Sequence, residues 1–133
     1  MNRRSFLKSL LFLFASLSLK IFPTEKTKTL AFNYGVASGD PTNTNVILWT
    51  KISGGDLKDK KIKWEVSNQK SFQKILVSGN AKAKFDDNFT VKVDAQIPSN
   101  FNGKTIYYRF SFQGIVSDIG TTKTLPINNP NKF

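Results

Sequence analysis

The sequence predicts an all-β domain, built as a two-sheet sandwich of about seven strands that follows an N-terminal signal helix. From Leu30 onward, apolar and β-branched runs of five to nine residues alternate with clusters of Gly, Pro, Asn and Asp. No stretch keeps the 3.6-residue period of an amphipathic helix. Six or seven short strands in about 100 residues are typical of the immunoglobulin and fibronectin type III sandwiches.

The chain begins with a segment typical of an export signal. Residues 1–8 are basic, and the eleven residues from Ser9 to Leu19 are predominantly apolar. At about 1.5 Å per residue, a helix of this length is too short to cross a hydrocarbon core of roughly 30 Å. We therefore predict a signal segment over residues 1–24 and expect membrane contact through this segment only.

The start of this segment resembles the twin-arginine motif of bacterial export signals, usually written Ser/Thr-Arg-Arg-x-Phe-Leu-Lys. Arg3, Arg4, Phe6 and Leu7 match the motif, whereas Asn2 stands where the motif has Ser or Thr. The resemblance implies an exported bacterial protein of the periplasm or cell envelope. Two alternatives stay open: an ordinary secretory signal that begins with two arginines, and an uncleaved anchor, because no small-x-small cleavage site is clear.

Seven strands are expected in the rest of the chain, and turn clusters separate them. The strands are Leu30–Tyr34, Asn45–Ile52, Lys61–Asn68, Lys74–Ser78, Phe89–Ile97, Thr105–Phe112 and Asp118–Leu125. The turn clusters contain Gly or Asn, which tolerate the positive φ values that turns need. They are Ser38–Pro41, Ser53–Asp56, Ser78–Asn80, Asp86–Asn88, Asn100–Gly103 and Gln113–Gly114. Residues 69–73 are compatible with a single helical turn.

Alternation along two of these strands identifies the core. Residues 61–66 place apolar side chains on one face and charged ones on the other, and residues 105–112 place an aromatic row on one face. The predicted core residues are Trp49, Trp64, Val66, Tyr108 and Phe110. Trp64 is expected at the centre, where its truncation to Ala costs about 3–5 kcal/mol. Tyr108 is a candidate for a tyrosine-corner hydrogen bond, with Ile106 at an alternative corner position.

Composition excludes several chemistries. The chain has no His and no Cys, so it offers no Ser-His or Cys-His pair, no disulfide and no imidazole or thiolate metal ligand. The net charge of +11 falls to +7 without the signal segment. Of the 20 basic residues, 17 are Lys, and scattered Lys is typical of a solvated surface rather than of specific nucleic-acid recognition.

The residues from Phe32 to Pro41, Phe-Asn-Tyr-Gly-Val-Ala-Ser-Gly-Asp-Pro, are followed by Val-Ile-Leu-Trp-Thr at positions 46–50. These two segments resemble the opening of the alkaline phosphatase D family, in which an Arg stands at the position of Lys51. The resemblance continues in order through shorter landmarks. These are Trp64–Val66, Phe72, Gly79, Tyr107–Phe110, Ser117, Gly120 and Thr122–Pro126.

This resemblance implies that residues 25–133 are the immunoglobulin-like N-terminal domain of an exported phosphatase. Members of the family continue into a larger metal-dependent domain, which uses iron and calcium to hydrolyse phosphomonoesters and phosphodiesters. No residue here matches the catalytic or metal-binding positions of that domain, so the metallophosphatase domain is expected to be absent. The chain is then a fragment, a truncated product or one part of a split enzyme.

The expected function is therefore that of a non-catalytic module, with no cofactor of its own. Its expected partner is a metallophosphatase domain, either in cis or as a separate chain. The alternative is a stand-alone envelope-localised module that binds an anionic ligand or surface, without specific recognition of nucleic acid.

The candidate docking loop comprises Gly35, Ser38, Gly39, Asp40 and Pro41. Its glycines permit close backbone approach, and the Asp-Pro pair favours a turn. The alternative is a strand-end turn in which Asp40 binds backbone amides. Catalysis by Ser38 is excluded, because the chain has no histidine base to activate its hydroxyl.

Two charged groups have a functional and a plainer interpretation. Asp86, Asp87 and Asn88 offer oxygen ligands for calcium, although adjacent acids in a hairpin are more typical of a solvated turn. The six lysines at positions 58, 60, 61, 63, 82 and 84 are compatible with a patch that attracts phosphate. A solvated face is the favoured interpretation of these lysines.

Overall fold

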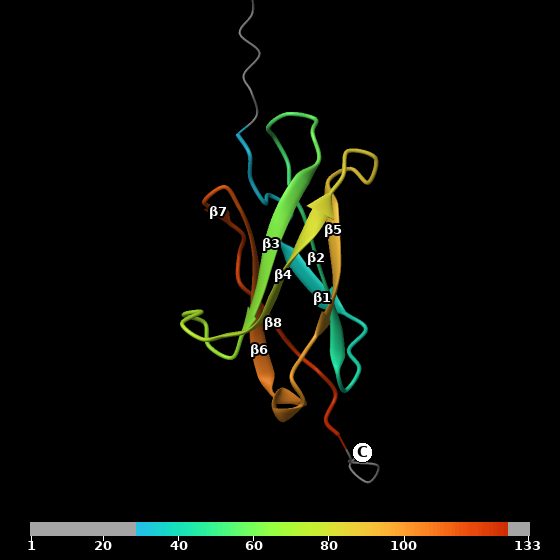
Figure 1. Cartoon of the computed structure of the whole chain (residues 1–133), viewed down its shortest axis with the longest axis vertical. Helices are drawn as coiled ribbons and strands as arrows, with labels where there is room; N and C mark the ends of the chain where they lie inside the picture. The colour runs from blue at the N-terminus through green and yellow to red at the C-terminus, as the bar shows by residue number, and fades with distance from the viewer. Residues whose placement is uncertain (1–28, 128–133) are drawn as a thin grey trace, which may run out of the picture.

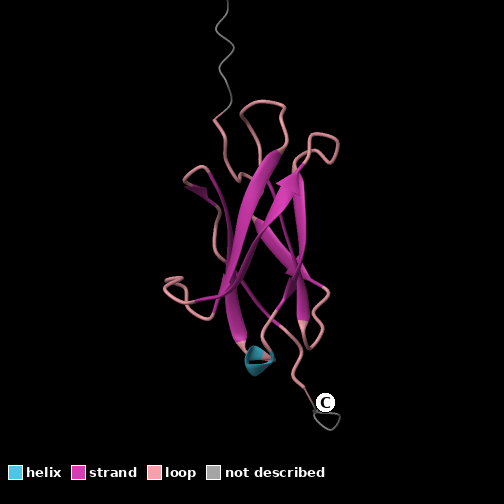
Figure 2. Cartoon of the chain, in the orientation of Figure 1, coloured by secondary structure: helices cyan, strands magenta, loops and turns pink. Residues whose placement is uncertain are grey.

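The computed structural model describes residues 29–127, which form a sandwich of two antiparallel sheets (Figures 1 and 2). The predicted all-β fold class is therefore confirmed. The strands are β1 (Val36–Gly39), β2 (Asn45–Lys51), β3 (Lys60–Ser67), β4 (Ile75–Ala83), β5 (Thr90–Gln96), β6 (Thr105–Phe112), β7 (Ile115–Val116) and β8 (Gly120–Lys123). A single turn of 3-10 helix, η1, spans Ser99–Phe101 and is cyan in Figure 2.

The smaller sheet has the order β1-β2-β5, and the larger one has the order β4-β3-β6-β7. Strand β8 joins the larger sheet by pairing with the first half of β6, while β7 pairs with its end. Figure 1 shows that the described chain enters at one end of the sandwich (blue) and leaves at the opposite end (red). Within residues 29–127, no helix is long and apolar enough to cross a membrane.

The core lies between the two sheets and follows strand alternation. On β5, Val91, Val93 and Ala95 are buried, while the residues between them are exposed. Three residues predicted in the core are buried there, namely Val66, Tyr108 and Phe110. The Tyr108 and Phe110 rings pack edge to face, with their centroids 6.4 Å apart.

The placement of Trp49 in the core is wrong, because its side chain is 48% exposed. The register with β5 sets the phase of β2: Leu48 lies opposite Val93, and Trp49 lies opposite the exposed Lys92. Leu48 therefore points into the core, and its neighbour Trp49 points to the outer face.

Trp64 lies at the border of the core rather than at its centre. It is half-buried and covers Gly79, its partner on β4; a Cβ atom at Gly79 would lie 2.8 Å from the ring carbon Cζ2. The turn predicted at Ser78–Asn80 is wrong, since β4 runs straight through this segment. Here glycine leaves room for a side chain and does not mark a turn.

The first predicted strand, Leu30–Tyr34, is also wrong: this segment makes only an isolated bridge between Ala31 and Ser53. The actual first strand is β1, which lies inside the segment predicted as a loop. Residues 69–73 form a turn without helix, closed by a 3.1 Å hydrogen bond from the Phe72 N–H to the Gln69 carbonyl.

Candidate domain-docking surface

The predicted docking loop is in part an edge strand. Val36 lies opposite Thr50 and Gly39 lies opposite Ile47, so β1 is hydrogen-bonded along β2. The strand is bounded by two positive φ values, 71° at Gly35 and 45° at Asp40. The Thr50 hydroxyl donates a 2.7 Å hydrogen bond to the Gly35 carbonyl and fixes the entry to the strand.

Ser38 has a structural role on the inner side of β1. Burial raises the pKa of the Tyr108 hydroxyl, and a hydrogen bond with Ser38 partly opposes that rise. The Tyr108 ring also lies against Gly120 of β8, where a Cβ atom would overlap it. Tyr108 of the larger sheet is therefore close to Ser38 of the smaller sheet.

The outer face of the smaller sheet carries an exposed apolar surface around Trp49. We call this surface the Trp49 face. Its members are Tyr34, Ala37, Gly39, Ile47, Trp49, Lys51 and Lys92. Ala37 and Lys92 flank Trp49 on the neighbouring strands.

Two hollows of about 240 and 230 Å³ lie beside the Trp49 ring on this face. Gly35, Ala37 and Tyr34 line the first, together with Lys51, whose ammonium lies 4.5 Å from the centroid of the Tyr34 ring. Of the predicted loop residues, Ser38, Gly39 and Asp40 line the second hollow. The structure therefore brings most of the predicted loop to the Trp49 face, whereas Pro41 is exposed outside both hollows.

The last part of the described chain is attached beside this face. The Leu125 N–H donates a 2.8 Å hydrogen bond to the carbonyl of Thr42, two residues after Asp40. The Thr42 hydroxyl in turn accepts a 2.9 Å hydrogen bond from the Asn45 N–H at the start of β2. The segment that leaves the sandwich is thus fixed to the β1–β2 connection, and Leu125 and Ile127 are exposed there.

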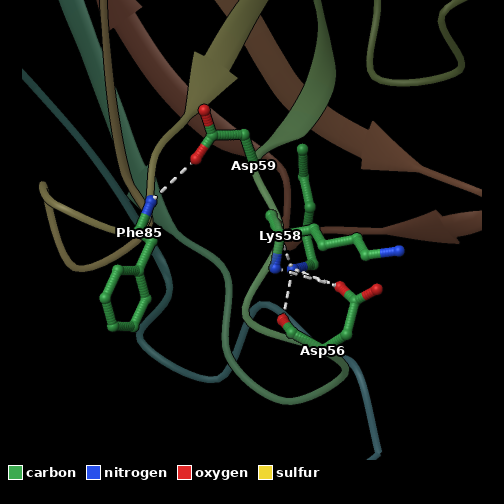
Figure 3. Close-up of polar contacts among 5 residues, drawn as sticks. Asp56, Lys58, Asp59 and Phe85 are labelled. Atoms are coloured by element: carbon green, nitrogen blue, oxygen red, sulfur yellow. Dashed lines mark hydrogen bonds and ion pairs between the residues drawn. The ribbon is translucent and has the colours of Figure 1, made fainter.

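Three of the six lysines of the predicted patch, Lys60, Lys63 and Lys82, form ion pairs. Lys60 is only 5% exposed, and its ammonium donates hydrogen bonds of 2.8 and 2.9 Å to the carbonyls of Asp56 and Lys58. The Asp59 carboxylate accepts a 3.1 Å hydrogen bond from the Phe85 N–H (Figure 3). Solvation was the favoured interpretation of these lysines, and it is wrong for Lys60, which stabilises its own turn.

The acids of this turn are held in their charged form. The hydrogen bond from Lys60 is the largest cause that lowers the pKa of Asp56, followed by the one from the Lys58 backbone. For Asp59 the largest cause that lowers the pKa is the hydrogen bond from the Phe85 backbone, and Lys82, 3.5 Å away, adds to it.

Asp86, Asp87 and Asn88 form a tight turn. The Asn88 N–H donates a 2.9 Å hydrogen bond to the Phe85 carbonyl, and the φ of Asn88 is 53°. Across residues 29–127 there is no group of three or more His, Cys, Asp or Glu side chains that could hold a metal ion. The structure therefore supports the turn interpretation of these residues.

The chain is similar to known proteins in sequence and in fold. Residues 16–126 match the family described as "PhoD-like phosphatase, N-terminal domain". The chain belongs to this family. This PhoD-like N-terminal domain is 38% identical over 108 residues to "Alkaline phosphatase D" of Bacillus subtilis (strain 168), a match that covers 75% of the chain and 18% of that protein.

A solved structure described as "Structure of PhoD" is similar as well. It superposes with a TM-score of 0.71 and 36% sequence identity, over 77% of this chain and 20% of that one. The chain thus spans about a fifth of the length of the relatives that it matches. The predicted export residues Arg3, Arg4, Phe6 and Leu7 lie outside the residues that the structure describes.

The exposure of Trp49 and the hollows beside it were missed by sequence reasoning. A usable signal was present in the run Val46-Ile-Leu-Trp49, which is apolar on both faces of the strand. Such runs are typical of strands with both faces covered, whereas strands with one wet face alternate. Because β2 pairs with β5, the alternating pattern of β5 shows which side of β2 faces the core, which the sequence of β2 alone does not.

Proposed function

We propose that this PhoD-like N-terminal domain is the non-catalytic front module of an exported alkaline phosphatase D-like enzyme, and that it packs against the phosphatase domain. The observation that carries the proposal is its membership of a family defined as an N-terminal domain, combined with coverage of 18% of a protein described as an alkaline phosphatase. The phosphatase domain is present in cis or as a separate chain.

The hydrolytic chemistry belongs to the phosphatase domain in this proposal. The chain has no His, and its described part has no cluster of ligand side chains, so iron and calcium are held by the partner domain. Purified full-length chain is expected to leave a chromogenic phosphate ester intact when iron and calcium are added. Hydrolysis at a rate proportional to chain concentration would overturn the non-catalytic role.

The partner is tested by co-expression. The full chain is produced together with the part of the Bacillus subtilis alkaline phosphatase D that follows the matched segment. We expect the two chains to purify together and the phosphatase part to be more soluble and more heat-resistant than when produced alone. Separate elution, with no change in either property, would contradict the proposal.

Export is tested separately in a bacterial host. Replacing Arg3 and Arg4 with Lys should stop export through the twin-arginine route, because that motif requires the arginine pair. Continued export of the double variant would assign the signal to the general secretory route.

The alternative, a stand-alone module for an anionic surface, has less support. Lys60, Lys63 and Lys82 each form an ion pair within the domain, at 3.3, 2.8 and 3.5 Å. Retention on heparin that falls steeply between 50 and 200 mM salt would show only counterion-driven attraction, whereas salt-resistant retention would favour this alternative.

A further inference from the structure

The outer side of β2 has the composition of a covered surface. Val46 and Leu48 point into the core, and Ile47 and Trp49 on the other side are apolar as well. The neighbouring strand β5 instead shows Lys92 and Asp94 outward, as expected for a wet face. Because nothing within residues 29–127 covers Trp49 fully, the apolar outer side of β2 calls for a partner surface.

The shape of the Trp49 face suits a partner surface that has a pocket for the Trp49 ring. Ala37 and Gly39 lie beside Trp49 and Ile47 on β1, and no atom lies within 4 Å of the position where Gly39 would carry a Cβ. The Trp49 ring therefore projects between two hollows, with Lys51 and Lys92 at the margin. A central aromatic anchor with a polar rim is typical of a protein–protein contact.

The place where the chain leaves the sandwich indicates which partner covers the Trp49 face. The family match is to an N-terminal domain and ends at residue 126, and the match covers only 18–20% of the length of the relatives. The Leu125 N–H is bonded to Thr42, so the chain after residue 126 starts beside Asp40 and the second hollow. Since an extended residue spans only about 3.3–3.6 Å, a domain joined by a short connection lies within reach of this face.

The centre of the outer face of the larger sheet is occupied by the chain's own charged pairs. Glu65 is 7% exposed there and is paired with Lys63 at 2.8 Å and Arg109 at 2.9 Å. Phe72 stacks on the Arg109 guanidinium at 4.2 Å and covers the pair. This face therefore offers no comparable apolar surface near the exit of the chain.

We propose that the Trp49 face is the surface that contacts the phosphatase domain, with the Trp49 side chain inserted as its anchor. The inference rests on the proposed function and adds to it the face and the residue. The phosphatase domain brings an apolar pocket for the indole ring and acidic or carbonyl groups for Lys51 and Lys92.

The absence of cysteine makes the face testable by thiol protection. Two matched variants of the full chain carry one cysteine each: Lys92→Cys on the Trp49 face and Lys61→Cys on the outer face of the larger sheet. Each is treated with a maleimide, alone and with the part of the Bacillus subtilis alkaline phosphatase D that follows the matched segment. Addition of that part should slow labelling at position 92 about tenfold, through exclusion of water from the contact, and leave position 61 unchanged.

Affinity gives a second readout. Trp49→Ala should weaken binding of the same phosphatase part about 30-fold, which is typical of an anchor residue. Val116→Ala also truncates an exposed apolar side chain, but on the larger sheet, and should leave binding unchanged. Circular dichroism of both variants verifies that they remain folded, and the cysteine variants test the face without altering Trp49.

The outcomes separate the two proposals. If the unmodified chain forms no complex, the proposed function fails and the docking face fails with it. If a complex forms but position 61 is protected as much as position 92 or more, the function holds and the assignment of the Trp49 face is overturned. Unchanged affinity of Trp49→Ala, with position 92 protected, keeps the face and removes Trp49 as its anchor.

Discussion

The outer faces of the two sheets differ in how their side chains are paired and covered. On the larger sheet, Lys63 and Arg109 each form an ion pair with Glu65, and Phe72 stacks on Arg109. On the smaller sheet, Trp49 is exposed and Ile47 partly exposed. Ala37 and Gly39 lie beside them on β1, and Lys92 and Asp94 lie beside them on β5. The centre of one face is filled by ion pairs of the chain itself, and the other face has the composition of a surface that a partner covers.

The closure of the larger sheet depends on local backbone geometry. The φ of Phe72 is 53°, a left-handed conformation that an aromatic residue adopts only with support from its surroundings. Here the Phe72 N–H bonds to Gln69, and the ring gains the contact with Arg109. The 68–74 segment thus places Phe72 against Arg109, a partner of the Glu65 carboxylate.

A large effect on stability is expected from filling the space beside the buried Tyr108 ring. Gly120→Ala places a Cβ on the buried Tyr108 ring, which links β6 and β8 to Ser38 of β1. We expect a loss of about 3 kcal/mol in the free energy of unfolding, because neither the backbone nor the buried ring has room to move. Urea denaturation gives the value directly.

Gly79→Ala is the matched control. Its Cβ meets the Trp64 ring at 2.8 Å, but Trp64 is half-buried and has open space on one side. A loss of about 1 kcal/mol is expected, since the neighbour can shift. Equal losses in both variants would mean that the buried Tyr108 ring accommodates the added methyl group as easily as the half-buried Trp64 ring does.

The fold class was predictable because alternation records burial on one side of a strand. Residues 61–66 and 105–112 show it clearly, and the buried Val66, Tyr108 and Phe110 follow from it. Trp49 was not predictable in this way, since β2 is apolar on both sides and its phase depends on pairing with β5. Long-range pairing also decides that Gly79 lies within a strand, because its role is to fit Trp64.

The candidate site was predictable only in part. The segment from Gly35 to Asp40 was singled out by its sequence, and it does line both hollows. Its state as an edge strand, and the position of Leu125 beside Thr42, depend on contacts between residues far apart in the chain. No local pattern contains that information.

The next effect tests how the larger sheet closes its outer face. Arg109→Ala removes one partner of the buried Glu65 carboxylate and the platform for Phe72. We expect a loss of about 2 kcal/mol, typical of a hydrogen bond to a charged group, because Lys63 remains as a second partner. Lys92→Ala, at an exposed position on the smaller sheet, should change stability by less than about 0.5 kcal/mol. Similar losses would erase the difference between the faces.

Acid should distinguish the faces further. Burial is the largest single influence on Glu65 and raises its pKa, but the hydrogen bonds from Lys63 and Arg109 together outweigh burial and lower the pKa below the ordinary 4.5. Ionised Glu65 therefore stabilises the folded chain above pH 4.5, and this contribution is lost as the pH falls from 4.5 through the lowered value.

The variant Glu65→Gln isolates this contribution. Its melting temperature should fall less than that of the unmodified chain as the pH is lowered from 7 to 3, since Asp56 and Asp59 remain in both proteins. If the melting temperatures of the two proteins fall equally across that pH range, the charge of Glu65 does not contribute to stability.

A small expected effect on stability separates the two faces most sharply. Trp49→Ala in the isolated chain should cost less than about 1 kcal/mol, because the ring is half exposed and points away from the core. Phe110→Ala, at a fully buried aromatic, should cost about 3–5 kcal/mol in the same urea titration. If the two losses are alike, Trp49 stabilises the sheet itself, and its presence on the outer face is explained by the stability of the domain and not by docking. If they differ as expected, the indole is available to a partner at almost no expense to the fold, and the affinity measurement then reports its contribution to docking alone.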